Sequence, residues 1–191
     1  MTYGALTLVD VEVLEQVLFE FKAAGRMKFL EIGVYEGHTS RGIRDFCAAN
    51  GIELEYWGIE SGTLCVPTRP FPDAHFVIGE SREVFMHLPD DFDVVFIDGD
   101  HTLNAVILDT LHYGAKVKPG GFLLCHDTSP EIQFKMAEPN RNYPEHPWFH
   151  NAVNAAHAML GFPTKEWREW LSRYQAGCAY GGMTVYRKEN Q

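Results

Sequence analysis

The order of apolar and polar residues predicts helices and strands that alternate along most of the chain. Five short apolar runs predict strands: "MKFLEIGV", "ELEYWGIES", "AHFVIGE", "FDVVFIDGD" and "GFLLCHD". Helical spacing between these runs predicts helices over residues 39–50, 81–88 and 102–118, with Ser81 as the N-cap of the second. Before the first run, residues 11–21 predict another helix, with Asp10 as N-cap and Gly25 as C-cap.

The run "FDVVFIDGD" is apolar without alternation, as expected of a strand that is covered on both faces, and it should be central. Strands that alternate with helices at this spacing require right-handed crossovers. The sequence therefore predicts an α/β, Rossmann-like, doubly wound sheet that is mostly parallel and carries helices on both faces.

The pattern changes after the fifth strand. Residues 129–147 hold four prolines and no sustained period, which predicts a long functional loop on the acceptor side of a site. A helix is expected to resume at "WFHNAVNAAHAML", and the glycine-punctuated tail predicts a hairpin with an antiparallel C-terminal edge strand. An edge strand near Val185 could support a homodimer.

No linker or repeat is visible, so residues 1–191 are expected to form one domain, with residues 1–27 as an N-terminal helical segment. The 26 acidic residues against 16 Lys and Arg give a formal charge of −10, which argues against nucleic acid as a partner. The four cysteines form no Cys-x-x-Cys, and no apolar stretch is long enough to span a bilayer. A cytoplasmic protein without a membrane partner is expected.

Acidic residues and glycines stand at the predicted strand ends, where open α/β sheets bind their ligands. A dinucleotide fingerprint needs Gly-x-Gly-x-x-Gly, but here Tyr35 occupies the middle position between Gly33 and Gly37. Glu60 ends the second strand, where it could take both hydroxyls of a ribose. A ligand with a ribose and no pyrophosphate fits both observations, and S-adenosylmethionine (SAM) is such a ligand.

The motifs "EIGVYEGHTS", "GIES", "GES", "FIDGDHT" and "PGGFLLCHDT" follow one another in the order seen in class I SAM-dependent methyltransferases. Over residues 28–127 the chain most resembles the catechol O-methyltransferase-like group and the related small methyltransferases with an Asp-Gly-Asp-His motif. The resemblance implies that Asp98 lies where cofactor, metal and substrate meet. It also implies this set of cofactor-binding residues: Glu31, Gly33, Tyr35, Gly37, Thr39, Glu60, Gly79, Glu80, Ser81 and Asp98.

Methylation of a hydroxyl requires that its proton be removed, and a divalent cation such as Mg²⁺ could help by binding the oxygen. Asp98, Asp127 and His126 offer ligand atoms at neighbouring strand ends, although a structural role for His126 is favoured over ligation. The resemblance places His101 where the catechol enzymes have a catalytic lysine. Since histidine titrates near neutral pH, His101 is the first candidate for general base, with Asp98 as the second catalytic residue.

The sequence thus predicts a SAM-dependent methyltransferase that acts on a small molecule, on oxygen in the first instance and with a divalent cation as an option. A nicotinamide-dependent oxidoreductase of Rossmann type is an alternative in the same fold. The missing middle glycine and the lack of a Tyr-x-x-x-Lys pair count against it. A cofactor-binding module without catalysis is a third reading, because "HDT" departs from the Asp-Asn pair of the catechol group.

Overall fold

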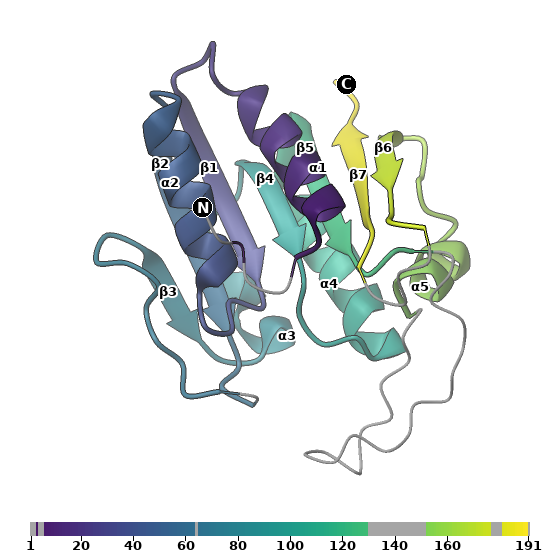
Figure 1. The fold of residues 1–191 in the computed structure, drawn as a ribbon. Helices are drawn as coiled ribbons and strands as arrows, with labels where there is room; N and C mark the ends of the chain where they lie inside the picture. Colours follow the sequence, from purple (N-terminus) through teal and green to yellow (C-terminus); the bar gives the residue numbers. More distant parts are fainter. Residues whose placement is uncertain (1–2, 4–5, 64, 130–151, 177–180, 191) are drawn as a thin grey trace.

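A computed structural model describes residues 3, 6–63, 65–129, 152–176 and 181–190. Its described strands form one seven-stranded sheet with the order β3-β2-β1-β4-β5-β7-β6 (Figure 1). The strands are β1 (Arg26–Ile32), β2 (Glu53–Glu60), β3 (His75–Ile78), β4 (Phe92–Ile97), β5 (Val117–His126), β6 (Trp167–Arg173) and β7 (Met183–Lys188). The first five are parallel, whereas β7 runs antiparallel to both β5 and β6. The predicted doubly wound, mostly parallel sheet is confirmed.

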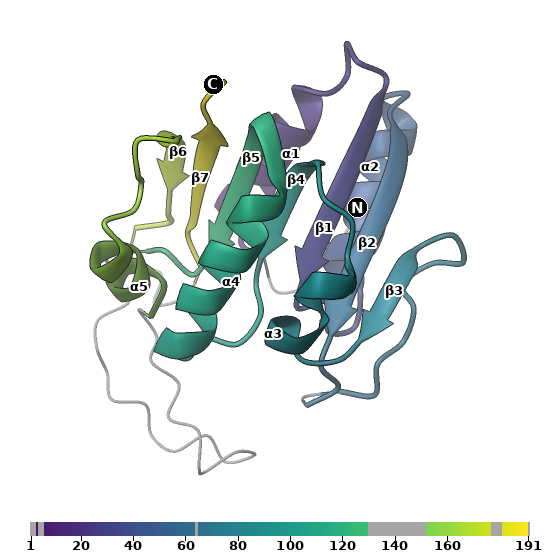
Figure 2. The same cartoon turned by 180° about the vertical axis from the view of Figure 1, so that it is seen from behind.

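Helices cover both faces of this sheet. On one face lie α1 (Leu8–Phe19) and α2 (His38–Ala49) (Figure 1). On the other lie α3 (Ser81–Val84), a 3₁₀ turn (Phe85–His87), α4 (Leu103–Lys116) and α5 (Ala152–Leu160) (Figure 2). Neighbouring strand residues supply the two cores in turn, since Phe29 packs under α1 and α2 while Leu30 packs under α4. All six residues of β4 are buried, as its unbroken apolar run predicted.

The ends of two helices differ from the sequence prediction. Thr7, rather than Asp10, is the N-cap of α1, and Asp10 in the third helical position completes a capping box with it. A helix gains more from this reciprocal pair than from a single cap, because two backbone N–H groups are satisfied. Ser81 is the first residue of α3 and Glu80 is its N-cap, since the Ser81 hydroxyl donates to Asp109 instead.

The antiparallel pair at the C-terminal edge is confirmed, with β6 as the outermost strand. The last strand, β7, lies between β5 and β6, and Val185 is paired on both sides, with Leu124 and Leu171. Four residues at the start of β7 are buried, whereas most of β6 is exposed, so the more apolar strand takes the interior place. Pairing of two copies through an edge at Val185, expected from the sequence, is therefore wrong.

The predicted loop over residues 129–147 and the start of the helix after it lie outside the described residues, apart from Ser129. Among the described residues, no helix is long and apolar enough to cross a membrane.

The connection after β1 leads to α2 on one face, and the connection after β4 leads to α4 on the other. The chain thus diverges between two adjacent parallel strands, at their carboxyl ends. A crevice is expected at such a switch point, and it is where α/β sheets bind ligands.

Candidate functional site

A cleft of about 930 Å³ opens at this switch point. Its walls come from the turn after β1, the end of β2, the turn after β3, the loop after β4 and the first turns of α4. Eight of the ten cofactor-binding residues expected from the sequence line this cleft: Gly33, Tyr35, Thr39, Glu60, Gly79, Glu80, Ser81 and Asp98. The cleft is large enough for a ligand with a nucleoside and an amino-acid end.

The turn after β1 explains why Tyr35 stands where a dinucleotide loop has glycine. Gly33 has a φ of +90°, and a Cβ there would overlap the carbonyl oxygen of Asp98, so β1 and β4 approach too closely for any other residue. Tyr35 adopts the left-handed region, and its backbone N–H donates to Glu60 Oε2 at 2.7 Å. Glu60 Oε1 accepts from Gly62 N at 3.0 Å, so the turn holds a carboxylate in place. Such a turn favours hydroxyl donors over a pyrophosphate.

Glu31 and Gly37 do not line the cleft. Glu31 is 1% exposed, and its Oε2 accepts from the Ser40 hydroxyl at 2.6 Å and the Tyr56 hydroxyl at 2.5 Å. Burial raises the pKa of Glu31 to about 8, and the hydrogen bonds from Ser40 and Tyr56 act in the opposite direction. Gly37 is the left-handed N-cap of α2, packed against Pro70. Both residues shape the turn from behind.

Asp109 on α4 is a cleft residue that the sequence analysis missed. It is 1% exposed, and its Oδ1 accepts from the Ser81 hydroxyl at 2.6 Å. Tyr113, one turn further along α4, donates to the Ser81 carbonyl at 2.7 Å. A signal was present in the sequence, because Asp109 lies three residues after Val106 on the buried face of the helix. Acidic side chains are rarely buried unless they have a partner.

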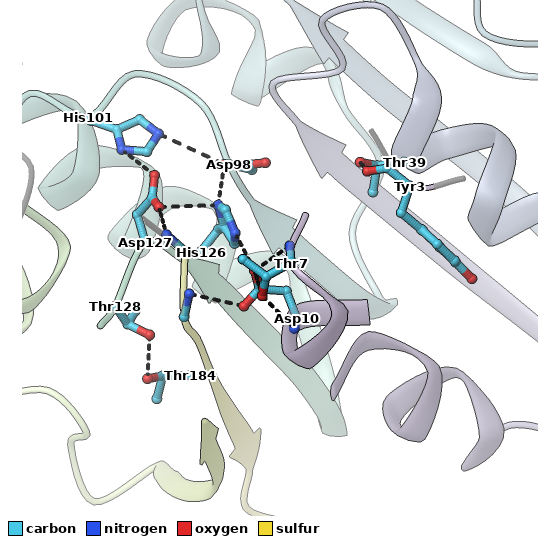
Figure 3. A network of polar contacts seen from close by, with 12 residues as sticks. Tyr3, Thr7, Asp10, Thr39, Asp98, His101, His126, Asp127, Thr128 and Thr184 are labelled. Atoms are coloured by element: carbon cyan, nitrogen blue, oxygen red, sulfur yellow. Dashed lines mark hydrogen bonds and ion pairs between the residues drawn. The ribbon is translucent and has the colours of Figure 1, made fainter. Parts of the chain in front are cut away.

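Four ionisable side chains meet where β4 and β5 end (Figure 3). His101 Nδ1 lies 3.0 Å from Asp127 Oδ2, and its Nε2 lies 3.8 Å from Asp98 Oδ1. His126 Nδ1 lies 3.0 Å from the same Asp98 oxygen. Asp127 is held in the left-handed region by the Gly181 N–H, which donates to its Oδ1 at 2.9 Å. The structure therefore brings together all four residues that the sequence nominated for catalysis or metal binding.

His126 is fixed on its other side by Asp10, whose Oδ2 lies 3.2 Å from Nε2. Asp10 is fully buried, and it also accepts from Thr7 and from the Gly182 N–H (Figure 3). Burial acts to lower the pKa of His126, but the carboxylates of Asp98, Asp10 and Asp127 outweigh it and hold the pKa well above the usual value. Burial likewise acts to raise the pKa of Asp10, yet His126 and Thr7 bring it below the usual value. The two residues form a buried ion pair.

The residues able to hold a cation differ from the set expected from the sequence. Asp98, His101 and Asp127 each offer a ligand atom, and these atoms lie within 4.8 Å of one another. Both ring nitrogens of His126 are engaged by Asp98 and Asp10, which suits its structural reading. Two carboxylates and an imidazole are a donor set that hard and borderline divalent cations accept.

Tyr3 contacts the start of α2 at Thr39 and Gly42. The Thr39 hydroxyl donates to the Tyr3 carbonyl at 3.1 Å (Figure 3). The Tyr3 ring is 5% exposed and packs on Gly42, where a Cβ would lie 2.6 Å from two ring carbons. The start of α2 is therefore held by the chain that precedes α1.

Residues 30–128, just over half of the chain, match the family model of a methyltransferase domain. No curated protein matches the chain. Solved structures with a similar fold include an O-methyltransferase from Bacillus cereus in complex with SAH, which is S-adenosylhomocysteine, the form of SAM without its methyl group. The two proteins share 13% identity over 97% of this chain and 84% of that chain, with a TM-score of 0.63. An O-methyltransferase from Streptomyces achromogenes in complex with SAM has 15% identity, coverage of 98% and 83%, and a TM-score of 0.59. An N-methyltransferase from Bradyrhizobium japonicum has 13% identity, coverage of 94% and 97%, and a TM-score of 0.57.

At these identities the structural neighbours show a shared fold, and the family model carries the assignment. It confirms the resemblance to the class I methyltransferases that the motifs suggested, and it displaces the oxidoreductase alternative. The chain belongs to the methyltransferase domain family.

Proposed function

We propose that this enzyme transfers the methyl group of SAM to a hydroxyl of a small molecule, with His101 as the general base. The observation that carries the proposal is the joint position of Glu60 and the Asp98–His101 pair on one cleft. One part of the cleft offers a carboxylate suited to a ribose, and another offers groups that can take a proton. Two O-methyltransferases among the structural neighbours support oxygen as the acceptor atom.

The residues present fit SAM. A carboxylate has about four acceptor sites, so Glu60 can accept two ribose hydroxyls in addition to the N–H groups of Tyr35 and Gly62. The first turn of α2 presents backbone N–H groups beside Thr39, and these suit the carboxylate of the methionine end. Gly79, Glu80 and Ser81 would edge the adenine. When bound, SAM supplies an activated methyl group.

His101 would remove the acceptor's proton. Asp127 Oδ2 accepts from Nδ1–H at 3.0 Å, which favours the tautomer in which Nε2 is the basic atom. Nε2 is directed toward Asp98, a residue that lines the cleft. A positioned base of this kind contributes on the order of 10²- to 10⁴-fold to a rate.

A divalent cation is a second candidate for activating the acceptor, favoured by the cluster of Asp98, His101 and Asp127. These three residues would hold it, and the cation would lower the pKa of a hydroxyl bound to it. The two roles compete for the imidazole of His101, because a nitrogen that ligates a cation does not accept a proton.

The test separates binding from turnover in His101→Gln, with His87→Gln as a matched control on an exposed surface outside the cleft. SAM affinity is measured by calorimetry, and SAH release is measured over a panel of phenols, catechols and aliphatic alcohols. We expect His101→Gln to bind SAM as the wild type does and to lose at least 100-fold in turnover. Full turnover by His101→Gln would remove His101 from the mechanism, and SAM binding without turnover on any acceptor would favour a binding module.

The cation is tested by treating the wild type with a chelator and then adding Mg²⁺ or Mn²⁺. If Asp98, His101 and Asp127 hold a cation, chelation abolishes turnover and the added metal restores it. Turnover that is indifferent to the chelator would leave His101 as the base and exclude the cation.

A further inference from the structure

The Asp109 carboxylate lies at a wall of the cleft that neither the base nor the candidate cation site uses. Helices α3 and α4 lie side by side on the face seen in Figure 2, and Asp109 reaches from α4 to the start of α3. There it holds the Ser81 hydroxyl through Oδ1, while Tyr113 holds the Ser81 carbonyl. Asp109 is therefore a fixed group with a known orientation.

The second oxygen of this carboxylate, Oδ2, accepts no hydrogen bond from the described residues, although Asp109 is 1% exposed. Gly99 faces it across the cleft wall, and a Cβ on Gly99 would lie 3.8 Å from Oδ2. Both residues line the cleft, and the glycine leaves the approach to Oδ2 without a side chain. Oδ2 is open to the cleft, since among the described residues His112 Nδ1 is the only buried side-chain N or O atom without a hydrogen-bond partner. A ligand donor can therefore reach this oxygen, and a charged acceptor on a largely dehydrated side chain favours such a donor.

The position of Oδ2 indicates which donor this is. With the ribose at Glu60 on β2, the base of a nucleoside extends toward Gly79 and Ser81 after β3, and so toward Asp109. The N–H donor that adenine presents on its ring edge is the 6-amino group. Resting on the proposed binding of SAM, we propose that Asp109 accepts a hydrogen bond from the 6-amino group of adenine and thereby selects adenosine cofactors over 6-oxo analogues.

A merely structural reading makes Asp109 an anchor for Ser81. The two readings differ in what happens when the Ser81 hydroxyl is removed. If Asp109 is only an anchor, Ser81→Ala, which loses the contact, should alter base selection, whereas Asp109→Asn, whose amide oxygen can still accept from Ser81, should leave it unchanged. A direct role would leave base selection intact in Ser81→Ala.

Burial raises the pKa of Asp109 to about 6, the hydrogen bond from Ser81 opposes the rise, and the charges of Asp100 and Glu80 add to it. At pH 8 the carboxylate is ionised and acts as an acceptor alone. The experiment is therefore run at pH 8.

The experiment compares calorimetric affinities for SAH and for S-inosylhomocysteine, in which an oxygen replaces the 6-amino group. The wild type should bind SAH roughly 10- to 100-fold more tightly, because the fixed Oδ2 loses the 6-amino donor and faces the 6-oxygen in its place, whereas the N–H that the 6-oxo ring gains is at N1. Asp109→Asn should abolish or reverse this ratio, because its amide can keep the Ser81 hydroxyl and offer N–H to the 6-oxygen. Ser81→Ala should lower both affinities by a similar factor and keep the ratio.

Asp73→Asn is the charge-matched control, since Asp73 is exposed and lies outside the cleft, and its ratio should equal that of the wild type. Equal binding of the two ligands by the wild type would overturn the proposal without any variant. An unchanged ratio in Asp109→Asn, or an equal loss of ratio in Ser81→Ala, would overturn it as well. If the wild type binds neither ligand, the proposed function fails, and this inference fails with it.

Discussion

Glu31 shows at the scale of one residue how the fold changes the chemistry of a side chain. The motif after β1 nominates it for the cofactor, but the structure turns its carboxyl group away from the cleft toward Ser40 and Tyr56. Burial raises its pKa to about 8, so the folded protein keeps a proton on Glu31 at neutral pH. Glu31 thus links β1, α2 and β2 as a largely neutral group behind the turn that follows β1.

The raised pKa of Glu31 predicts a pH dependence of stability. The unfolded chain releases this proton near pH 4.5 and the folded protein near pH 8, so the free energy of unfolding falls as the pH rises between these values. Glu31→Gln should remove this contribution, of order 1.4 kcal/mol per pH unit. We expect the variant to gain stability relative to the wild type between pH 5.5 and 8.5, measured by urea unfolding. Parallel stability curves for the two proteins would contradict the assignment.

At the scale of elements, α1 is attached to the sheet by one buried ion pair. Asp10 on α1 and His126 at the end of β5 are 116 residues apart in sequence, and Asp10 also accepts from Gly182 just before β7. Removing one partner of a buried pair leaves the other charge without compensation. The contact therefore fixes α1 to the carboxyl ends of the strands, near Asp98 and His101.

Asp10→Asn should accordingly destabilise the protein by about 3–5 kcal/mol in urea unfolding. Glu12→Gln is the matched control on the same helix, because Glu12 is exposed and its nearest cation, on Arg173, is 3.9 Å away in solvent. We expect a change below about 1 kcal/mol for the control. Equal losses in the two variants would mean that Asp10 contributes no more than a surface charge.

The same elements show what the sequence could predict. The five parallel strands and the helices between them follow from local periodicity, and Gly33, Glu60 and Asp98 follow from their places at strand ends. The place of β7 inside the sheet depends on which of two strands buries more apolar surface. The contacts of Asp10 with His126 and of Ser81 with Asp109 join distant segments. A single sequence can mark Asp109 as an acid on a buried helix face, but it does not name the partner of either acid.

At the scale of the whole molecule, the cleft is negatively charged, as is the chain with its formal net charge of −10. Among the described residues that line the cleft, Arg82 is the single Arg or Lys. Six acidic residues line it: Glu36, Glu60, Glu80, Asp98, Asp100 and Asp109. Such a field attracts a cation and repels a pyrophosphate. SAM carries a sulfonium and an ammonium group, whereas NAD carries a pyrophosphate, so the cleft as a whole favours SAM.

The most direct test of this account is calorimetric titration of the purified protein with SAM and with NAD, repeated with Glu60→Gln. We predict that SAM binds the wild type, that NAD does not, and that Glu60→Gln weakens SAM at least about tenfold through the loss of charged hydrogen bonds to the ribose. Tighter binding of NAD than of SAM, or SAM affinity unaffected by Glu60→Gln, would contradict the cofactor site described above.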